Sequence, residues 1–252
     1  MPPCFVRFNM KVFEIKLTNK LAKLTVYLPD ASKEMPYMAI RPGVLVIPGG
    51  GYSMCSDREA EPIALSFLAK GYAAFVLRYT VGGENDFSMP FADANEAMKI
   101  IHENAGEWCI DKEKIAVIGF SAGGHLCAAI STMGEIRPAA SILVYPCILE
   151  SISRILAFPV PGLEKEVDGK TPPAFIVAAC ADDLVPIENS LAYADALNKA
   201  GIPFEVHIYE KGYHGFSLAD NTVYSKAEAD YCAHIKGWFD LCATWLGKRF
   251  ES

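Results

Sequence analysis

Short apolar runs recur along the chain from residue 43 onward, and segments of helical length and period lie between them. Runs of this length that are apolar on both faces are typical of strands in a parallel sheet that helices cover on both sides. We therefore predict an α/β fold with a mostly parallel sheet and right-handed crossover connections. The runs comprise residues 44–47, 73–77, 115–118, 141–145, 175–179 and 204–208.

The segments between these runs carry apolar residues at the spacing of an amphipathic helix. Gly71 and Gly201 come directly after two of the segments. A helix commonly ends in a left-handed residue, which glycine adopts most easily, so we predict that both glycines cap a helix in this conformation. The expected helices comprise residues 59–70, 92–104, 122–133, 187–200 and 225–246.

Two parts of the chain lie outside this alternation. Residues 11–17 and 22–29 alternate apolar and polar side chains, which predicts an antiparallel hairpin at one edge of the sheet. Residues 150–171 contain prolines and glycines that interrupt the pattern, so we expect an excursion over the strand ends, with a short helix at 151–156 and at most a minimal lid. Because no repeat or linker is visible, residues 1–252 are expected to form a single domain.

The composition favours a globular protein with a large core. Residues of the set AVILMFWYC make up 52% of the chain, and the formal net charge is −7. An acidic balance opposes binding to phosphate backbones, so nucleic acid is not an expected partner. The 8 cysteines form no C-x-x-C pair and no metal-ligand spacing with the 5 histidines. We expect reduced core cysteines, no bound metal and no cofactor.

Membrane insertion and secretion are also disfavoured. The longest apolar stretches, residues 139–149 and 173–181, are shorter than the roughly 18 residues of a membrane-spanning helix. Arg7 and Lys11 interrupt every apolar stretch near the N-terminus, so no signal core can be drawn, although Met10 is an alternative start. We expect a cytoplasmic protein with no membrane partner, and a homodimer is one option for its oligomeric state.

A G-x-S-x-G motif occupies residues 119–123, after an expected strand and before an expected helix. In this context the two glycines permit a sharp turn that exposes the serine hydroxyl above the sheet, at a helix N-terminus. Ser121 is therefore a candidate nucleophile. The alternative is a tight strand-to-helix turn in which the serine is incidental.

An activated serine needs a base, and imidazole can accept its proton near neutral pH. Four of the histidines lie inside or beside helical and strand patterns, whereas His214 lies in a polar, glycine-flanked loop after the last expected strand. Such a loop lies at the same edge of a parallel sheet as Ser121, which makes His214 the candidate base. A structural histidine at the surface or in the core is the alternative.

A carboxylate is suited to hold the imidazole tautomer and to stabilise the imidazolium. Asp182 and Asp183 follow the strand expected at 175–179, so either can reach the same edge, and the other would cap a helix or turn. Residues 49–51 are three glycines after the strand expected at 44–47. Their amides are candidate oxyanion donors, and no Gly-Lys-Ser/Thr follows that would indicate a Walker motif.

The order glycine-rich turn, G-x-S-x-G, D-x-x-V-P and H-G-F resembles the α/β-hydrolase superfamily. Within it, the chain is similar to small carboxylesterases of the acetyl-xylan-esterase-like and lipase/esterase-like kind. The resemblance implies an α/β-hydrolase fold, with helices on both faces of the sheet. It also implies Ser121 as the nucleophile, His214 as the base and Asp182 or Asp183 as the acid. The implied oxyanion donors are the amides of Gly50, Gly51 and Ala122.

The D-x-x-V-P spacing favours Asp182 over Asp183, because Asp182 lies four residues before Pro186. One feature departs from the family pattern. Many relatives of the hormone-sensitive-lipase type carry a histidine before the glycines, and this chain has Pro48 there. The short excursion at residues 150–171 also replaces the large lid of lipases, which favours an open site.

The resemblance implies a serine carboxylesterase that hydrolyses short-chain acyl esters through an acyl-enzyme, with acetylated sugars as a candidate substrate class. One alternative is a prolyl-oligopeptidase-like peptidase, which shares the D-x-x-V-P and H-G signals but has a propeller domain that nothing here resembles. Another is a ligand-binding protein that keeps the fold without catalysis. Four aromatic residues are candidates for the pocket wall, with core packing as the alternative: Tyr52, Tyr79, Phe87 and Phe216.

Overall fold

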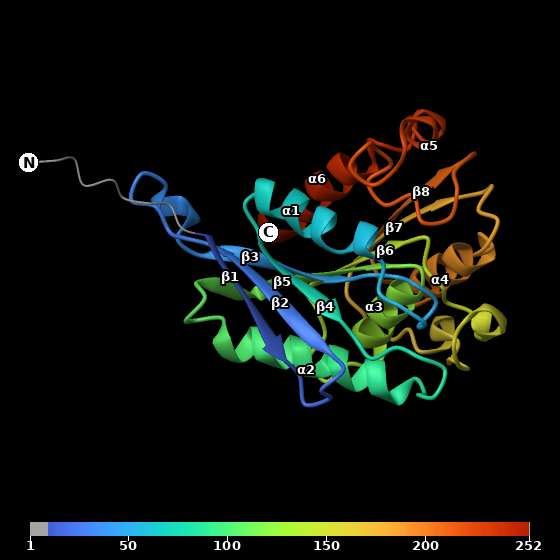
Figure 1. Cartoon of the computed structure of the whole chain (residues 1–252), viewed down its shortest axis with the longest axis horizontal. Coiled ribbons are helices and arrows are strands. Elements are labelled where there is room, and N and C mark those ends of the chain that lie inside the picture. Colours follow the sequence, from blue (N-terminus) through green and yellow to red (C-terminus); the bar gives the residue numbers. More distant parts are fainter. Residues whose placement is uncertain (1–9, 252) are drawn as a thin grey trace, which may run out of the picture.

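A computed structural model describes residues 10–251, which contain one eight-stranded mixed sheet (Figure 1). The strand order across the sheet is β1-β2-β4-β3-β5-β6-β7-β8. The pairs β1–β2 and β2–β4 are antiparallel, and every other neighbouring pair is parallel. The strands are β1 (Met10–Lys16), β2 (Lys23–Pro29), β3 (Arg41–Ile47), β4 (Ala73–Arg78), β5 (Ile110–Phe120), β6 (Ala140–Val144), β7 (Ala174–Ala179) and β8 (Phe204–Tyr209).

The sheet confirms the predicted fold class and the predicted N-terminal hairpin. The hairpin strand β1 forms one edge, and its register with β2 runs from Met10 opposite Pro29 to Lys16 opposite Lys23. The six apolar runs predicted as parallel strands coincide with β3 to β8. Layers on either side of the sheet bury the apolar runs of β3 to β7, whereas the edge strand β8 is partly exposed, with Phe204 and Ile208 at the surface.

Helices cover both faces of the sheet (Figure 1). In β3, Leu45 and Ile47 pack toward one layer, whereas Val44 and Val46 pack toward the other, and all four are fully buried. The first layer contains α2 (Ser88–Asn104), α3 (Ala122–Met133) and α4 (Glu188–Lys199), and the second contains α1 (Glu61–Ala69) and α6 (Trp238–Glu251). Between residues 10 and 251, no helix combines the length and apolar character that a membrane crossing needs.

The predicted glycine caps are confirmed. Gly71 and Gly201 have φ angles of 94° and 70°, in the left-handed region that glycine tolerates without a steric penalty. Their amides donate hydrogen bonds to Leu68 and Asn198, in the last turns of α1 and α4. Each glycine thus reverses the chain directly before the next strand segment.

The prediction of one helix over residues 225–246 was wrong. The structure contains α5 (Lys226–Tyr231) and then, after a break, α6. In the break, the amides of Ile235 and Trp238 each donate to the carbonyl three residues earlier, at 2.9 Å. This tight winding aligns Cys232, Ile235 and Trp238, and all three are fully buried. The tighter winding that buries these three side chains is therefore favoured here over the continuous α-helix that the apolar period predicted.

The excursion at residues 150–171 is confirmed as a compact segment with little helix. It contains the short 3₁₀ helices η3 (Glu150–Ile155) and η4 (Leu163–Lys165), the first at the position predicted for a short helix. Backbone hydrogen bonds attach it to the rest of the fold: the Ala157 amide donates to the Gly51 carbonyl at 2.8 Å, and the Leu163 amide donates to that of Ile148. The excursion therefore packs against the glycine-rich segment that follows β3.

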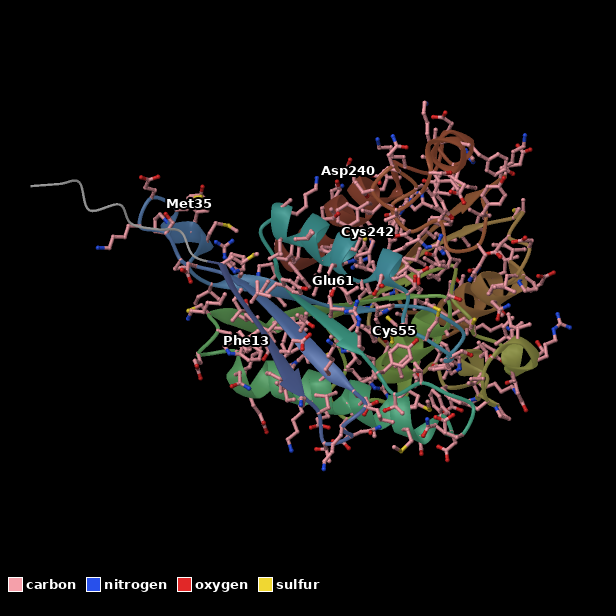
Figure 2. The ribbon with its side chains drawn as sticks, viewed as in Figure 1. Phe13, Met35, Cys55, Glu61, Asp240 and Cys242 are labelled. Carbon is pink, nitrogen blue, oxygen red and sulfur yellow. The ribbon has the colours of Figure 1, made fainter. Side chains whose placement is uncertain are left out.

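The cysteines follow the prediction only in part. Cys127, Cys147, Cys232 and Cys242 are buried free thiols, and Figure 2 labels Cys242 within α6 and Cys55, which is half-buried. Two thiols expected in the core are exposed instead, at Cys109 and Cys180. Both lie at ends of strands rather than inside them, in the turn before β5 and directly after β7, where helices no longer cover the sheet. Cys4 lies outside the described residues.

His125 of α3 is a buried structural residue, as its helical position suggests. Its Nδ1 lies 2.9 Å from the Tyr52 hydroxyl, and its Nε2 lies 2.9 Å from the Pro161 carbonyl oxygen. Because a carbonyl can only accept, Nε2 carries the hydrogen and the Tyr52 hydroxyl donates to Nδ1. Burial lowers the pKa of His125 to about 4, since the charged ring would lose its hydration.

We expect His125 to make the folded state less stable in acid. The unfolded chain takes up this proton near pH 6.5, and the folded chain only near 4, so the unfolded state binds more protons in this window. The free energy of unfolding then falls as the pH decreases, by at most about 3 kcal/mol. Urea denaturation from about pH 7 to about pH 4.5 should give a steeper pH dependence for wild type than for His125→Gln. Equal slopes in the two proteins would contradict this role.

Candidate active site

The G-x-S-x-G segment forms a sharp turn between β5 and α3. Ser121 has φ 53° and ψ −119°, a conformation that residues with a side chain seldom adopt. Its amide donates to the Val144 carbonyl at 3.0 Å, and its carbonyl accepts from the amides of Cys147 and His125 at 3.0 and 3.1 Å. These three hydrogen bonds hold the backbone of Ser121 in its strained conformation and thereby fix the position of the hydroxyl.

Glycines are required on both sides of Ser121 because neighbouring backbone approaches closely. A Cβ at Gly123 would lie 2.2 Å from the carbonyl oxygen of Ile47, at the end of β3. A Cβ at Gly119 would lie 2.2 Å from the carbonyl oxygen of Gly123. The first turn of α3 can therefore lie against the end of β3 only without these side chains.

Three predicted residues from separate loops form one chain of hydrogen bonds. The Nε2 atom of His214 lies 2.8 Å from Oγ of Ser121, and Nδ1 lies 2.7 Å from Oδ2 of Asp182. Asp182 follows β7, and His214 lies in the histidine loop, residues 210–219, which follows β8. A carboxylate accepts the Nδ1 hydrogen, so Nε2 is free to accept the proton of the serine hydroxyl.

Asp182, and not the adjacent Asp183, is the aspartate that contacts His214. Its side chain is 2% exposed, and its second oxygen accepts hydrogen bonds from the amides of Leu184 and Val185, each at 2.9 Å. Asp183 is exposed. The carboxylate of Asp182 is therefore fixed by the backbone of its own turn, in the orientation that the imidazole needs.

The glycine turn, residues 49–51, follows β3 beside Ser121. Gly50 and Gly51 have φ angles of 127° and 63°, and the Gly50 carbonyl accepts the amides of Ser53 and Met54. Within residues 10–251, neither glycine amide donates a hydrogen bond, and both residues line the same cavity as Ser121. Ala122 does not line that cavity, but it begins α3, where a helix has amides without acceptors in its own backbone.

The cavity has a volume of about 360 Å³. The nucleophile candidate and its histidine share the cavity lining with apolar side chains from the excursion and from the loop after β7, and with several polar groups. The lining residues are Gly50, Gly51, Ser53, Met54, Ser56, Arg58, Glu59, Ser121, Ile155, Leu156, Leu184, His214 and Gly215.

None of the four aromatic candidates for the pocket wall lines this cavity. Tyr52, Tyr79 and Phe216 are buried in the core, and Phe87 packs edge-on against Tyr52. The Tyr79 hydroxyl donates to the carbonyl of Pro48 at 2.9 Å. Tyr79 therefore supports the segment before the glycine turn from the core side, whereas Phe216 packs in the other layer against Tyr145 and Trp238.

Comparison with known proteins identifies the family. A family model described as the dienelactone hydrolase family matches residues 107–242, more than half of the chain, and a model described as BD-FAE matches residues 24–139. The crystal structure of an α/β-hydrolase enzyme from a Medee basin deep-sea metagenome library is 43% identical, with a TM-score of 0.89 over 96% of this chain and 99% of that one. The chain belongs to the α/β-hydrolase superfamily.

Two further similar proteins have names that refer to acetyl esters and to xylan or xylosides. The acetyl ester-xyloside bifunctional hydrolase of Caldicellulosiruptor lactoaceticus is 31% identical, with a TM-score of 0.78 over 96% of both chains. The acetylxylan esterase of Xylanibacter ruminicola is 35% identical over 78% of this chain and 46% of its own length. The chain spans between a third and a half of the length of the first curated relatives it matches.

Sequence reasoning missed two residues beside this α/β-hydrolase site, Glu59 and its hydrogen-bond partner Tyr145. Glu59, expected at the start of a helix, lies in the 3₁₀ helix η2 (Asp57–Glu59) and is only 3% exposed. Its carboxylate accepts hydrogen bonds from the Gly49 amide and the Tyr145 hydroxyl. Burial raises the pKa of Glu59, and these two hydrogen bonds oppose the shift. An acidic residue directly before an apolar helical segment was the one available signal, and it is equally typical of a helix start.

We expect Gly123→Ala to destabilise the protein by about 3 kcal/mol, because the added methyl group would overlap the backbone of Ile47. Gly247→Ala is the matched control: no atom lies within 4 Å of a Cβ there, and alanine favours the helix α6 by about 0.5 to 1 kcal/mol. Urea denaturation of the two variants measures both effects. A Gly123→Ala protein as stable as wild type would show that the elbow does not depend on this contact.

Proposed function

We propose that this protein is a serine carboxylesterase that hydrolyses short-chain acyl esters, with acetylated sugars as its substrate class. The observation that carries the proposal is the chain of hydrogen bonds from Ser121 through His214 to Asp182, at 2.8 and 2.7 Å. Relatives named acetylxylan esterase and acetyl ester-xyloside hydrolase support it. Small-molecule esters are then its partners.

In the first step, the hydroxyl oxygen of Ser121 attacks the carbonyl carbon of the ester while His214 Nε2 takes the hydroxyl proton. The imidazole becomes an imidazolium, and the negative charge of Asp182 stabilises it through the 2.7 Å hydrogen bond to Nδ1. The carbonyl oxygen of the substrate gains a negative charge. The amides of Gly50, Gly51 and Ala122 are the proposed donors to that oxyanion.

In the second step, the tetrahedral intermediate collapses and His214 returns the proton to the leaving alcohol. The acyl group is then bonded to Ser121. Water attacks this acyl-enzyme, its proton passes to His214, and the carboxylic acid leaves as Ser121 regains its hydrogen. Every proton in this cycle moves through one imidazole nitrogen, Nε2, so no metal or cofactor is needed.

The cavity supports a small acyl group. Ile155 and Leu156 of the excursion line the 360 Å³ space, and the segment that carries them is held to Gly51 by a backbone hydrogen bond. Ser53, Ser56 and Arg58 also line the cavity and can form hydrogen bonds with the hydroxyls of a sugar, the arginine as a donor. A cytoplasmic location, the homodimer option and the absence of nucleic-acid and membrane partners stay predictions from the sequence.

Replacement of the nucleophile gives the most direct test. We expect Ser121→Ala to lower kcat for p-nitrophenyl acetate by about 10⁴- to 10⁶-fold without unfolding the protein. Wild-type turnover should fall from acetate to butyrate to octanoate, and a fluorophosphonate should label wild type but not the variant. Turnover retained in Ser121→Ala would refute the proposal. A preference for the corresponding amide would favour a peptidase, and a protein with neither turnover nor label would be a binding protein on the hydrolase fold.

The two adjacent aspartates provide a matched pair. Asp182→Asn should lower kcat by about 10³- to 10⁴-fold, because an amide at this position would favour the wrong imidazole tautomer. Asp183→Asn should leave kcat almost unchanged, since that side chain is exposed. Steady-state kinetics of the two variants, with circular dichroism as a check on folding, decides the assignment. The reverse ranking would identify Asp183 as the acid.

A further inference from the structure

A fully buried carboxylate lies beside the proposed catalytic groups without belonging to the hydrogen-bonded chain that contains them. Glu59 is 3% exposed and lines the cavity that contains Ser121 and His214. Burying a carboxylate is costly, and a well-packed apolar side chain would often serve stability equally well. Its presence here therefore calls for an explanation in terms of the site.

Each oxygen of Glu59 accepts a hydrogen bond from a different part of the fold. Oε2 accepts the Gly49 amide at 2.8 Å, and Gly49 opens the glycine turn. Oε1 accepts the Tyr145 hydroxyl at 2.7 Å, and Tyr145 follows β6. A Cβ at Gly49 would lie 2.8 Å from Oε2 and 2.9 Å from Cβ of Ser121, so the carboxylate, the glycine turn and the serine are in close proximity.

Tyr145 extends this connection to the histidine loop. Its hydroxyl oxygen accepts the Ser217 amide at 3.1 Å, and its ring meets the His214 ring at a centroid distance of 5.0 Å. The Ser217 hydroxyl in turn donates to the carbonyl of Arg58 at 2.6 Å. Residues 58 and 59 therefore both hold the histidine loop at Ser217, Arg58 directly through the hydroxyl and Glu59 through Tyr145 and the amide.

We propose that Glu59 is a positioning residue of the esterase site, whose carboxylate fixes the glycine turn and the histidine loop relative to each other. This inference rests on the proposed function. The proposed oxyanion amides of Gly50 and Gly51 follow β3, whereas the base follows β8, and these strands are separated by three others in the sheet. A carboxylate has two acceptor oxygens and no donor, which matches the N–H and O–H groups that converge on it from the two sides.

Burial and the neighbouring groups act on the charge of Glu59 in opposite directions. Burial raises the pKa of Glu59, and the hydrogen bonds from Tyr145 and Gly49, together with the electrostatic influence of His214 and Arg58, oppose that rise. A glutamine would keep only one of the two hydrogen bonds unchanged. With its oxygen toward the Gly49 amide, which can only donate, its NH₂ would face the Tyr145 hydroxyl, which could then no longer donate to residue 59.

The test compares Glu59→Gln, Tyr145→Phe and the double variant with wild type, using p-nitrophenyl acetate. We expect each single variant to lower kcat by about 10- to 100-fold with KM within about threefold, because the reacting groups are misplaced while the cavity wall is kept. The kcat of the double variant should be no lower than that of the more impaired single variant, because both changes break the same connection. Glu61→Gln is the matched control, since Glu61 pairs with Arg78 at 2.8 Å and does not line the cavity.

The outcomes separate this inference from the proposed function. Wild-type activity that disappears in Ser121→Ala, together with Glu59→Gln and Tyr145→Phe at wild-type kcat, would overturn the positioning role alone. Losses that multiply in the double variant would overturn it as well. Wild type without Ser121-dependent hydrolysis would overturn the esterase proposal first. If Glu59→Gln fails to fold by circular dichroism, Tyr145→Phe decides, because it leaves the carboxylate bound to Gly49.

Discussion

The candidate site depends on a close backbone contact between α3 and the end of β3. At Gly123 the two segments approach so closely that a Cβ would lie 2.2 Å from the Ile47 carbonyl oxygen. This contact brings the serine turn after β5 next to the glycine turn after β3, so one cavity contains the hydroxyl of Ser121 and the amides of Gly50 and Gly51. The site geometry therefore requires that residue 123 has no side chain, whichever reactive groups the site contains.

The sequence predicted those parts of the structure that local patterns determine. Strands β3 to β8 follow from apolar runs, and Ser121, Asp182 and His214 follow from motifs at strand ends, which a parallel sheet brings to one edge. Glu59 and Tyr145 could not be found this way, because a glutamate before a helix and a tyrosine at a strand end are common. Their connection crosses 86 residues of sequence and exists only in the folded chain. The break between α5 and α6 was missed for a related reason. Cys232, Ile235 and Trp238 are buried at a spacing of three residues, and in the sequence this spacing is also compatible with a continuous α-helix.

Two kinds of residue support the reacting groups, and they differ in what they cost the fold. The buried aromatics Tyr52 and Tyr79 add apolar contact area and satisfy His125 and Pro48 with their hydroxyls, so they stabilise the fold and the site together. Glu59 is different, because burial of its charge opposes folding. A site that includes such a group gives up stability for the orientation of backbone that it provides.

The hydrogen bond between Ala157 and Gly51 links two parts of the molecule that could otherwise diverge independently. Ile155 and Leu156, two residues and one residue before Ala157, form part of the cavity wall, while Gly51 belongs to the turn that supplies the proposed oxyanion donors. An insertion or deletion near residue 157 would therefore move the acyl wall and the turn at once. For the proposed esterase, side-chain exchanges at 155 and 156 would alter the acyl preference while the turn keeps its place, whereas changes in the length of the excursion would disturb turnover itself.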